Sequence, residues 1–218
     1  MEDNTVKIAY FGAAVFDITT DKGKRILIDP YITQNSLCHK KLEYFNDVNL
    51  LLVSHGSYDH LGDTIEIMKQ SQATLICGGD VARYCIKMGI PKERIKSTVY
   101  GDEKEFEGIK IKAVYARHQS KVESGTEIFY GAPLGFIVTT ENDIRIYHTG
   151  DTALFDDFKL IGMYYRPNIF LVGISGMGGG CPYRDGCRRG VTGYSMGCTR
   201  RCHSHALPNR VRCPLEIS

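Results

Sequence analysis

The sequence of 218 residues lacks any apolar run long enough to cross a membrane. A membrane-spanning helix needs about 18 or more consecutive apolar residues. The N-terminus, Met-Glu-Asp-Asn-Thr, is acidic and leads directly into a strand-like segment, so it also lacks the pattern of a signal peptide. These absences predict a cytoplasmic protein that has no membrane partner.

The chain also lacks a large excess of charge and an internal repeat. Its formal net charge is +2, its hydrophobic content is 43% and its charged content is 24%. These values are ordinary for a soluble globular protein. The length fits one α/β domain with a substantial buried core.

Cysteine and arginine are unevenly distributed along the chain. Residues 181–218 hold five of the eight cysteines and seven arginines, but no lysine and only two acidic residues. This change in composition divides the chain into a domain at residues 1–180 and an anomalous Cys/Arg-rich tail at residues 181–218.

Apolar periodicity predicts alternating strands and helices. Residues 7–18, with a bend at Gly12, predict β structure. Further strands are expected at residues 25–28, 50–53, 74–77, 97–100, 105–106, 109–115, 134–140, 144–148 and 169–172. Helical segments are expected at residues 64–70, 80–88 and 155–164, and a short helical or loop segment at residues 42–46. Alternating elements combined with antiparallel strands predict an α+β fold, a four-layer αββα sandwich with two sheets face to face.

Three metal-ligand residues follow the predicted strand at residues 50–53. His55, Asp59 and His60 fall within six positions. Imidazole and carboxylate together suit Zn²⁺, with Mn²⁺ or Fe²⁺ as alternative ions. The other interpretation is that these residues cap a helix and form ordinary surface hydrogen bonds.

Two further strand ends carry a histidine and an acid. His118 follows the predicted strand at residues 109–115, and Asp151 follows the one at residues 144–148. Strand ends can converge on one rim of a β-sandwich, where a bridging Asp151 would hold two ions about 3.5–4 Å apart.

The order of these motifs resembles the metallo-β-lactamase superfamily, and within it the metal-dependent hydrolases similar to L-ascorbate-6-phosphate lactonase. The resemblance covers roughly residues 6–178. It is carried by Leu27-Ile28-Asp29-Pro30, Ser54-His55-Gly56-x-x-Asp59-His60, His118, Gly135-Phe136 and Tyr147-His148-Thr149-Gly150-Asp151-Thr152. It implies a hydrolase domain at residues 1–180 that uses a metal-bound hydroxide on an ester, lactone or phosphodiester of a small molecule.

The resemblance also implies a role for each site residue. His55 and His118 would bind a first Zn²⁺ ion, Asp59 and His60 a second, and Asp151 would bridge the two. Asp59 and Asp151 would also be the catalytic carboxylates. Beside this site, His148 would orient Asp151 rather than bind metal, and Asp29 would lie in the layer behind the ligands.

Ser57 departs from the family pattern, because it stands where a second histidine is expected. A serine hydroxyl is a poor ligand beside imidazole, so the first ion would be weakly bound or absent. A final histidine within an Ile-Pro-Met-His-Tyr-like segment is also missing. The alternative function is therefore a catalytically dead member of the family with a binding or structural role.

The tail supports a different hypothesis from metal or nucleic-acid binding. The spacing of Cys198, Cys202, His203 and His205 is too compact for a zinc finger, and the basic residues lack interleaved aromatics. Codons permitted for residues 202–208, read one base forward, encode Ala-Ile-Pro-Met-His-Tyr. We therefore predict that residues 181–218 are translated out of frame and poorly ordered.

Overall fold

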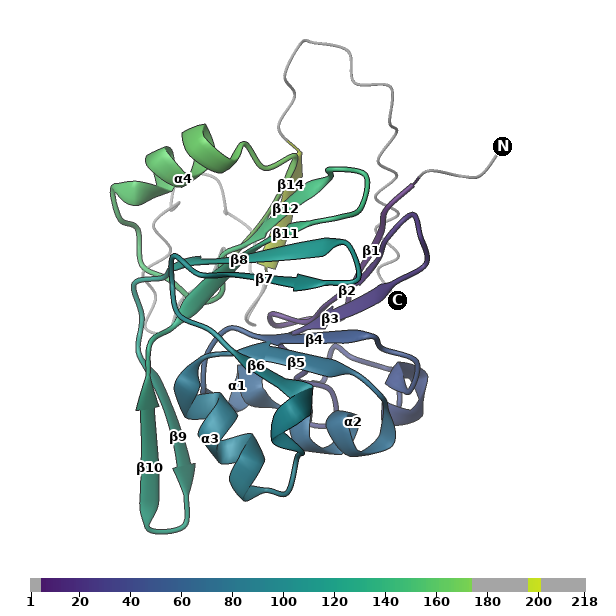
Figure 1. The fold of residues 1–218 in the computed structure, drawn as a ribbon, viewed down its shortest axis with the longest axis vertical. Helices are drawn as coiled ribbons and strands as arrows, with labels where there is room; N and C mark the ends of the chain where they lie inside the picture. The colour runs from purple at the N-terminus through teal and green to yellow at the C-terminus, as the bar shows by residue number, and fades with distance from the viewer. Residues whose placement is uncertain (1–4, 174–195, 201–218) are drawn as a thin grey trace.

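The computed structural model describes residues 5–173 and 196–200. These residues form two six-stranded sheets and a separate two-stranded hairpin (Figure 1). The strand orders are β1-β2-β3-β4-β5-β6 in the first sheet and β14-β13-β12-β11-β8-β7 in the second. Strands β3 to β6 run parallel, whereas β1 and β2 pair antiparallel at the other edge.

The elements have the following bounds. The first sheet consists of β1 (Lys7–Tyr10), β2 (Phe16–Thr19), β3 (Arg25–Ile28), β4 (Leu50–Val53), β5 (Thr74–Cys77) and β6 (Ile95–Ser97). The second consists of β7 (Glu103–Phe106), β8 (Ile109–Tyr115), β11 (Leu134–Thr139), β12 (Arg145–His148), β13 (Ile169–Gly173) and β14 (Met196–Arg200). The hairpin is β9 (Ser120–Ser124) with β10 (Glu127–Gly131). The helices are α1 (Tyr58–Leu61), α2 (Thr64–Gln70), α3 (Gly79–Lys87) and α4 (Asp157–Tyr165), with short 3-10 turns η1 (Leu42–Phe45) and η2 (Lys92–Arg94).

Strand β4 shows how the sequence builds the layers. Leu50 and Leu52 point into the core between the two sheets. Leu51 and Val53 point to the other face, into the core beneath α2 and α3. A strand buried on both faces reads as a continuous apolar run, which is why β4 is Leu-Leu-Leu-Val.

A third core lies between the second sheet and α4 and includes Ile137, Tyr147 and Ile161. Helices therefore cover the outer face of each sheet (Figure 1). This arrangement confirms the predicted four-layer αββα sandwich. Among the described residues, no helix is both long enough and apolar enough to span a bilayer.

Most predicted elements are present, but the strand predicted at residues 97–100 is not. Strand β6 ends at Ser97, and Val99 and Tyr100 are 61% and 52% exposed in the following loop. Their β propensity had no buried surface to pack against, so it did not decide the structure.

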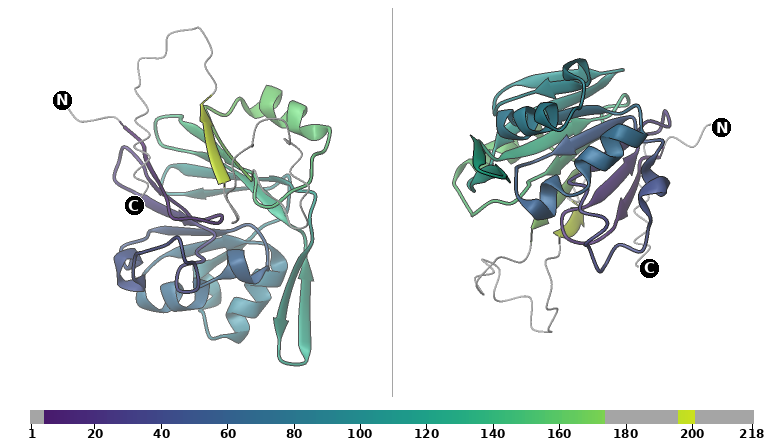
Figure 2. Two further views of the ribbon diagram at one scale, coloured as in Figure 1. Left: turned by 180° about the vertical axis from the view of Figure 1, so that it is seen from behind. Right: turned by 90° about the horizontal axis from the view of Figure 1, so that it is seen from below.

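None of the predicted strands lies within residues 181–218, but the structure has one strand there, β14. Strand β14 pairs antiparallel with β13 at the edge of the second sheet (Figure 2). The prediction that residues 181–218 are out of frame and poorly ordered otherwise falls outside the described residues.

Candidate metal centre

Three of the predicted ligands come together from three separate strand ends. His55 follows β4, His118 follows β8, and Asp151 follows β12. One ligand atom from each of these side chains lies within 4.8 Å of the other two. Because β4 belongs to one sheet and β8 and β12 to the other, the cluster lies where the two sheets meet at one rim.

The other two predicted ligands lie beside this cluster, on α1. Nε2 of His60 is 3.5 Å from Oδ2 of Asp151 and 4.0 Å from Oδ2 of Asp59. The ring centroids of His55 and His60 are 4.1 Å apart. All five predicted ligands therefore surround one small volume, with Asp151 between the two groups.

Asp29 anchors the ligands from behind and has no exposed surface. Its Oδ1 accepts the backbone N–H of Ser54 at 2.7 Å. Its Oδ2 accepts the Ser54 hydroxyl at 2.7 Å and lies 2.8 Å from Nδ1 of His60. A carboxylate can only accept, so His60 carries a proton on Nδ1 and presents Nε2 to the site.

The same reasoning assigns the tautomer of His55. The Ser54 hydroxyl donates to Asp29, so its oxygen accepts from Nδ1 of His55 at 3.0 Å. Nε2 of His55 is then the unprotonated nitrogen, and it is buried with no hydrogen-bond partner among the described residues. Burial, reinforced by the neighbouring His60, lowers the pKa of His55 to about 3 and keeps its ring neutral.

The pKa values of His60 and Asp151 each shift in the direction opposite to the one that burial alone would cause. Burial lowers the pKa of His60, but Asp29 and Asp151 outweigh burial and raise it to about 10. Burial raises the pKa of Asp151, but His60, His55 and His118 outweigh burial and lower it to about 2. Asp151 is therefore anionic at neutral pH, and the site attracts positive charge.

His148 contacts the loop that carries Asp151 rather than the ligand cluster. Its ring is fully buried, and Nδ1 accepts the backbone N–H of Gly150 at 3.2 Å. Gly150 has φ +58°, and a Cβ there would lie 2.7 Å from the carbonyl oxygen of Leu134. Both features hold the backbone directly before Asp151 in one conformation.

Ser57 points to a ligand instead of to the space between the ligands. Its hydroxyl donates to Oδ1 of Asp59 at 2.6 Å. This bond leaves Oδ2 of Asp59 facing His60. The departure from the family pattern thus exchanges an imidazole for a group that orients a carboxylate.

The donor set fits a divalent cation. His55, His118 and Asp151 provide two imidazoles and one carboxylate, and three protein ligands with one open position are the pattern of catalytic zinc sites. Burying the Nε2 of His55 without a hydrogen-bond partner destabilises the folded state, and a bound cation would supply the partner.

The sequence interpretation missed the hairpin β9–β10 and the residues that fix it. Ser120 donates a hydrogen bond to the buried carboxylate of Asp80 on α3 and accepts the backbone N–H of Gly56 at 2.9 Å. A Cβ on Gly56 would lie 2.5 Å from Val122, so β9 packs directly on the loop that carries His55. The alternation of residues 120–124 and the Ser-Gly turn after it were the available signals.

The chain matches a family of known proteins over the region that builds this site. Residues 24–178 match the model of the beta-lactamase superfamily domain. A UPF0173 metal-dependent hydrolase from Rubrobacter xylanophilus is 36% identical over 170 residues, covering 77% of this chain and 69% of that protein. A metal-dependent hydrolase from Sulfurisphaera tokodaii is 39% identical over 173 residues, covering 78% and 72%.

Solved structures agree with the fold. A metallo hydrolase from Ignicoccus hospitalis superposes with a TM-score of 0.67 at 30% identity, covering 78% of this chain and 71% of that chain. A possible metal-dependent hydrolase from Veillonella parvula has a TM-score of 0.59 at 18% identity, covering 76% and 70%, which shows a shared fold.

Proposed function

The chain belongs to the metallo-β-lactamase superfamily, and we propose that it is a hydrolase that depends on a divalent metal ion, Zn²⁺ first among the candidates. Its substrate is a small molecule that contains an ester, lactone or phosphodiester bond. The observation that carries the proposal is the convergence of His55, His118 and Asp151, together with the buried Nε2 of His55, which has no hydrogen-bond partner within residues 5–173 and 196–200. The relatives named above are themselves metal-dependent hydrolases by name.

The residues of the site would have the following roles in metal binding and catalysis. His55, His118 and Asp151 would hold one ion, and Asp59, His60 and Asp151 a second. A bound ion supplies Lewis acidity and lowers the pKa of water. Asp151 stays anionic and accepts a hydrogen bond from the attacking water, which orients it toward the scissile carbon or phosphorus.

The reaction consumes one water molecule for each bond that breaks. For an ester, the water oxygen bonds to the carbonyl carbon and loses a proton, the acyl C–O bond breaks, and that proton passes to the leaving alkoxide. Asp59 is placed to hold that proton in transit, because Oδ1 is bound to Ser57 whereas Oδ2 faces the site. Asp29 keeps Nε2 of His60 directed at the same volume.

Metal analysis and a turnover screen test the proposal. We expect at least about one equivalent of Zn or Mn in purified protein, together with hydrolysis of an ester, lactone or phosphodiester. The Asp151→Ala variant should lose both, whereas His39→Ala, which changes an exposed histidine outside the site, should lose neither. Less than half an equivalent of metal with no turnover would instead support the catalytically dead alternative, for which Ser57 is the motivating residue.

A further inference from the structure

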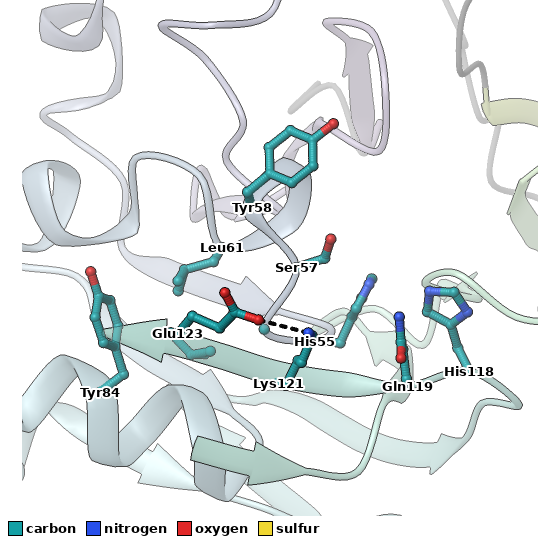
Figure 3. A pocket seen from close by; sticks show the side chains of 11 residues that line it. His55, Ser57, Tyr58, Leu61, Tyr84, His118, Gln119, Lys121 and Glu123 are labelled. Atoms are coloured by element: carbon teal, nitrogen blue, oxygen red, sulfur yellow. Dashed lines mark hydrogen bonds and ion pairs between the residues drawn. The ribbon is translucent and has the colours of Figure 1, made fainter. Parts of the chain in front are cut away.

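A cavity of about 310 Å³ lies beside the candidate metal centre (Figure 3). His55 and His118 line one end, and Tyr84 of α3 lines the other. This volume is at the lower limit of the roughly 300–1,000 Å³ found for small-molecule sites. The cavity therefore has room for one small group that extends from the metal centre toward α3.

Part of the cavity lining is apolar and adjoins the loop that carries His55. Leu61 of α1 and Val122 of β9 line it and are 8% and 3% exposed. Gly56 allows the loop that carries His55 to pack closely against β9, since a Cβ there would lie 2.7 Å from the carbonyl oxygen of Lys121. A ligand in the cavity could thus contact the Leu61 and Val122 side chains and His55 at the same time.

The charges on the cavity wall cancel each other. Lys121 and Glu123 are two positions apart on β9, on the same face of the strand. Nζ of Lys121 lies 2.7 Å from Oε1 of Glu123 (Figure 3). They are the only lysine, arginine or carboxylate side chains among the described residues that line the cavity. The wall consequently offers no uncompensated charge to a substrate.

We propose that this cavity is an acyl pocket, which holds an uncharged aliphatic or aryl arm of the substrate while the scissile carbonyl lies at the metal centre, beside the end of the cavity that His55 and His118 line. The proposal rests on the proposed hydrolase function and narrows it to neutral esters and lactones over phosphodiesters. The Lys121–Glu123 pair presents one like and one opposite charge to any charged arm, so it gives neither an anionic nor a cationic arm a net attraction. An uncharged arm leaves the pair intact and covers Leu61 and Val122.

Binding of ketones that cannot be hydrolysed tests the pocket without turnover. Methyl ketones carrying a butyl, a 3-carboxypropyl or a 3-(trimethylammonio)propyl arm have similar size, differ in charge and have no second arm large enough to fill the cavity. The chain contains no tryptophan, so Tyr84→Trp places a single fluorescent reporter at the end of the cavity. We expect saturable quenching by the butyl ketone, with a Kd about tenfold or more below the Kd of either charged ketone.

Saturation-transfer NMR on the unmodified protein makes the same comparison without relying on the Tyr84→Trp variant. Equal or tighter binding of a charged ketone would overturn the proposal. Binding of none of the three ketones would also overturn it.

Two charge variants test the role of the ion pair. Glu123→Gln leaves Lys121 unpaired, so the affinity ratio of the carboxylate ketone to the butyl ketone should rise about tenfold. Lys121→Gln should raise the corresponding ratio for the trimethylammonium ketone. Glu127→Gln is the matched control, because Glu127 lies on the same hairpin and pairs with Lys87 at 2.5 Å, outside the cavity. Unchanged ratios in the first two variants, or an equal change in the control, would contradict the proposal.

Ester turnover separates this proposal from the proposed function. If the enzyme hydrolyses p-nitrophenyl pentanoate and its carboxylate and trimethylammonium analogues at equal rates, the acyl-pocket proposal is wrong. The proposed hydrolase function would still hold. Selective binding of the butyl ketone, with no turnover of any ester, would overturn the hydrolase function and leave the pocket standing.

Discussion

Oδ2 of Asp29 lies 2.8 Å from Nδ1 of His60, and both side chains are almost completely buried. The carboxylate accepts the Nδ1–H of His60 and so leaves Nε2 as the nitrogen that faces Asp59 and Asp151 and gives up its proton when a metal ion binds. Second-layer partners of this kind typically contribute about 10–100-fold to metal affinity.

Asp29→Asn should therefore weaken metal binding by about 10–100-fold. The asparagine amide can donate to Nδ1 of His60 and so favour the wrong tautomer, which ¹⁵N chemical shifts of the imidazole would reveal. Zn²⁺ titration calorimetry measures the affinity. Asp17→Asn is the control, because Asp17 is a buried acid paired with Arg25 away from the site and should leave metal affinity unaltered. Equal affinities of Asp29→Asn and wild type would refute this role of Asp29.

Removing metal should make stability depend on pH in two opposite ways. The pKa of His60 is raised to about 10, so its stabilising contribution is complete below the unfolded value of about 6.5 and is lost as the pH rises toward 10. The pKa of His55 is lowered to about 3, so its contribution is complete above about 6.5 and is lost as the pH falls toward 3.

Urea unfolding of chelator-treated protein between pH 4 and 10 measures these contributions. The difference in unfolding free energy between wild type and His60→Gln should decrease as the pH rises from about 6.5 to about 10. A difference that stays constant over this range would show that His60 is not held protonated in the folded metal-free protein.

Replacing Ser57 by histidine should strengthen metal binding. The imidazole would join His55, His118 and Asp151 as a further nitrogen ligand, and we expect the affinity for one ion to rise about tenfold or more. Ser57→Ala is the matched comparison, since it removes the bond to Asp59 without adding a ligand and should weaken binding. Calorimetry with Zn²⁺ distinguishes the two, and an affinity of Ser57→His no higher than wild type would contradict the expected position of residue 57.

Ser120→Ala should loosen the contact between the hairpin β9–β10 and the loop that carries His55. The substitution leaves the Gly56 N–H and the buried Asp80 carboxylate without the hydroxyl that bridges them. We expect a loss of about 1–3 kcal/mol in unfolding free energy and faster hydrogen exchange at the Gly56 amide. Ser124→Ala, at the tip of the same strand, should alter neither. Unchanged exchange at Gly56 in Ser120→Ala would show that the bridge does not hold the loop.

Genomic sequencing tests whether residues 181–218 are out of frame. We expect a one-base insertion or deletion near codons 176–185, after which the restored frame encodes an Ile-Pro-Met-His-Tyr segment. The family match ends at residue 178, directly before the change in composition, which supports this proposal. If no single-base shift in this region opens such a frame, the hypothesis is wrong.

Local sequence patterns were sufficient for the elements that are buried on a regular period. Predicted bounds for β3, β4, β5, β8 and α2 coincide with the structure, because apolar residues there alternate between cores or repeat along one helix face. The hairpin β9–β10 was not predicted, because Lys121, Glu123 and Tyr130 are exposed and its pairing depends on α3 and on Gly56.

The sequence by itself predicted a set of metal ligands, and it determined that His55, His118 and Asp151 each follow a strand. His55, Asp59 and His60 fall within six positions of the chain, so their proximity could be predicted without tertiary information. Only the tertiary structure decided that His118 and Asp151 meet them, since that depends on how two sheets pack at one rim. It also decided which way the His60 ring faces, because a carboxylate 31 positions away is buried against its Nδ1. Hydrogen-bond direction and burial arise from contacts between distant segments, which local periodicity does not encode.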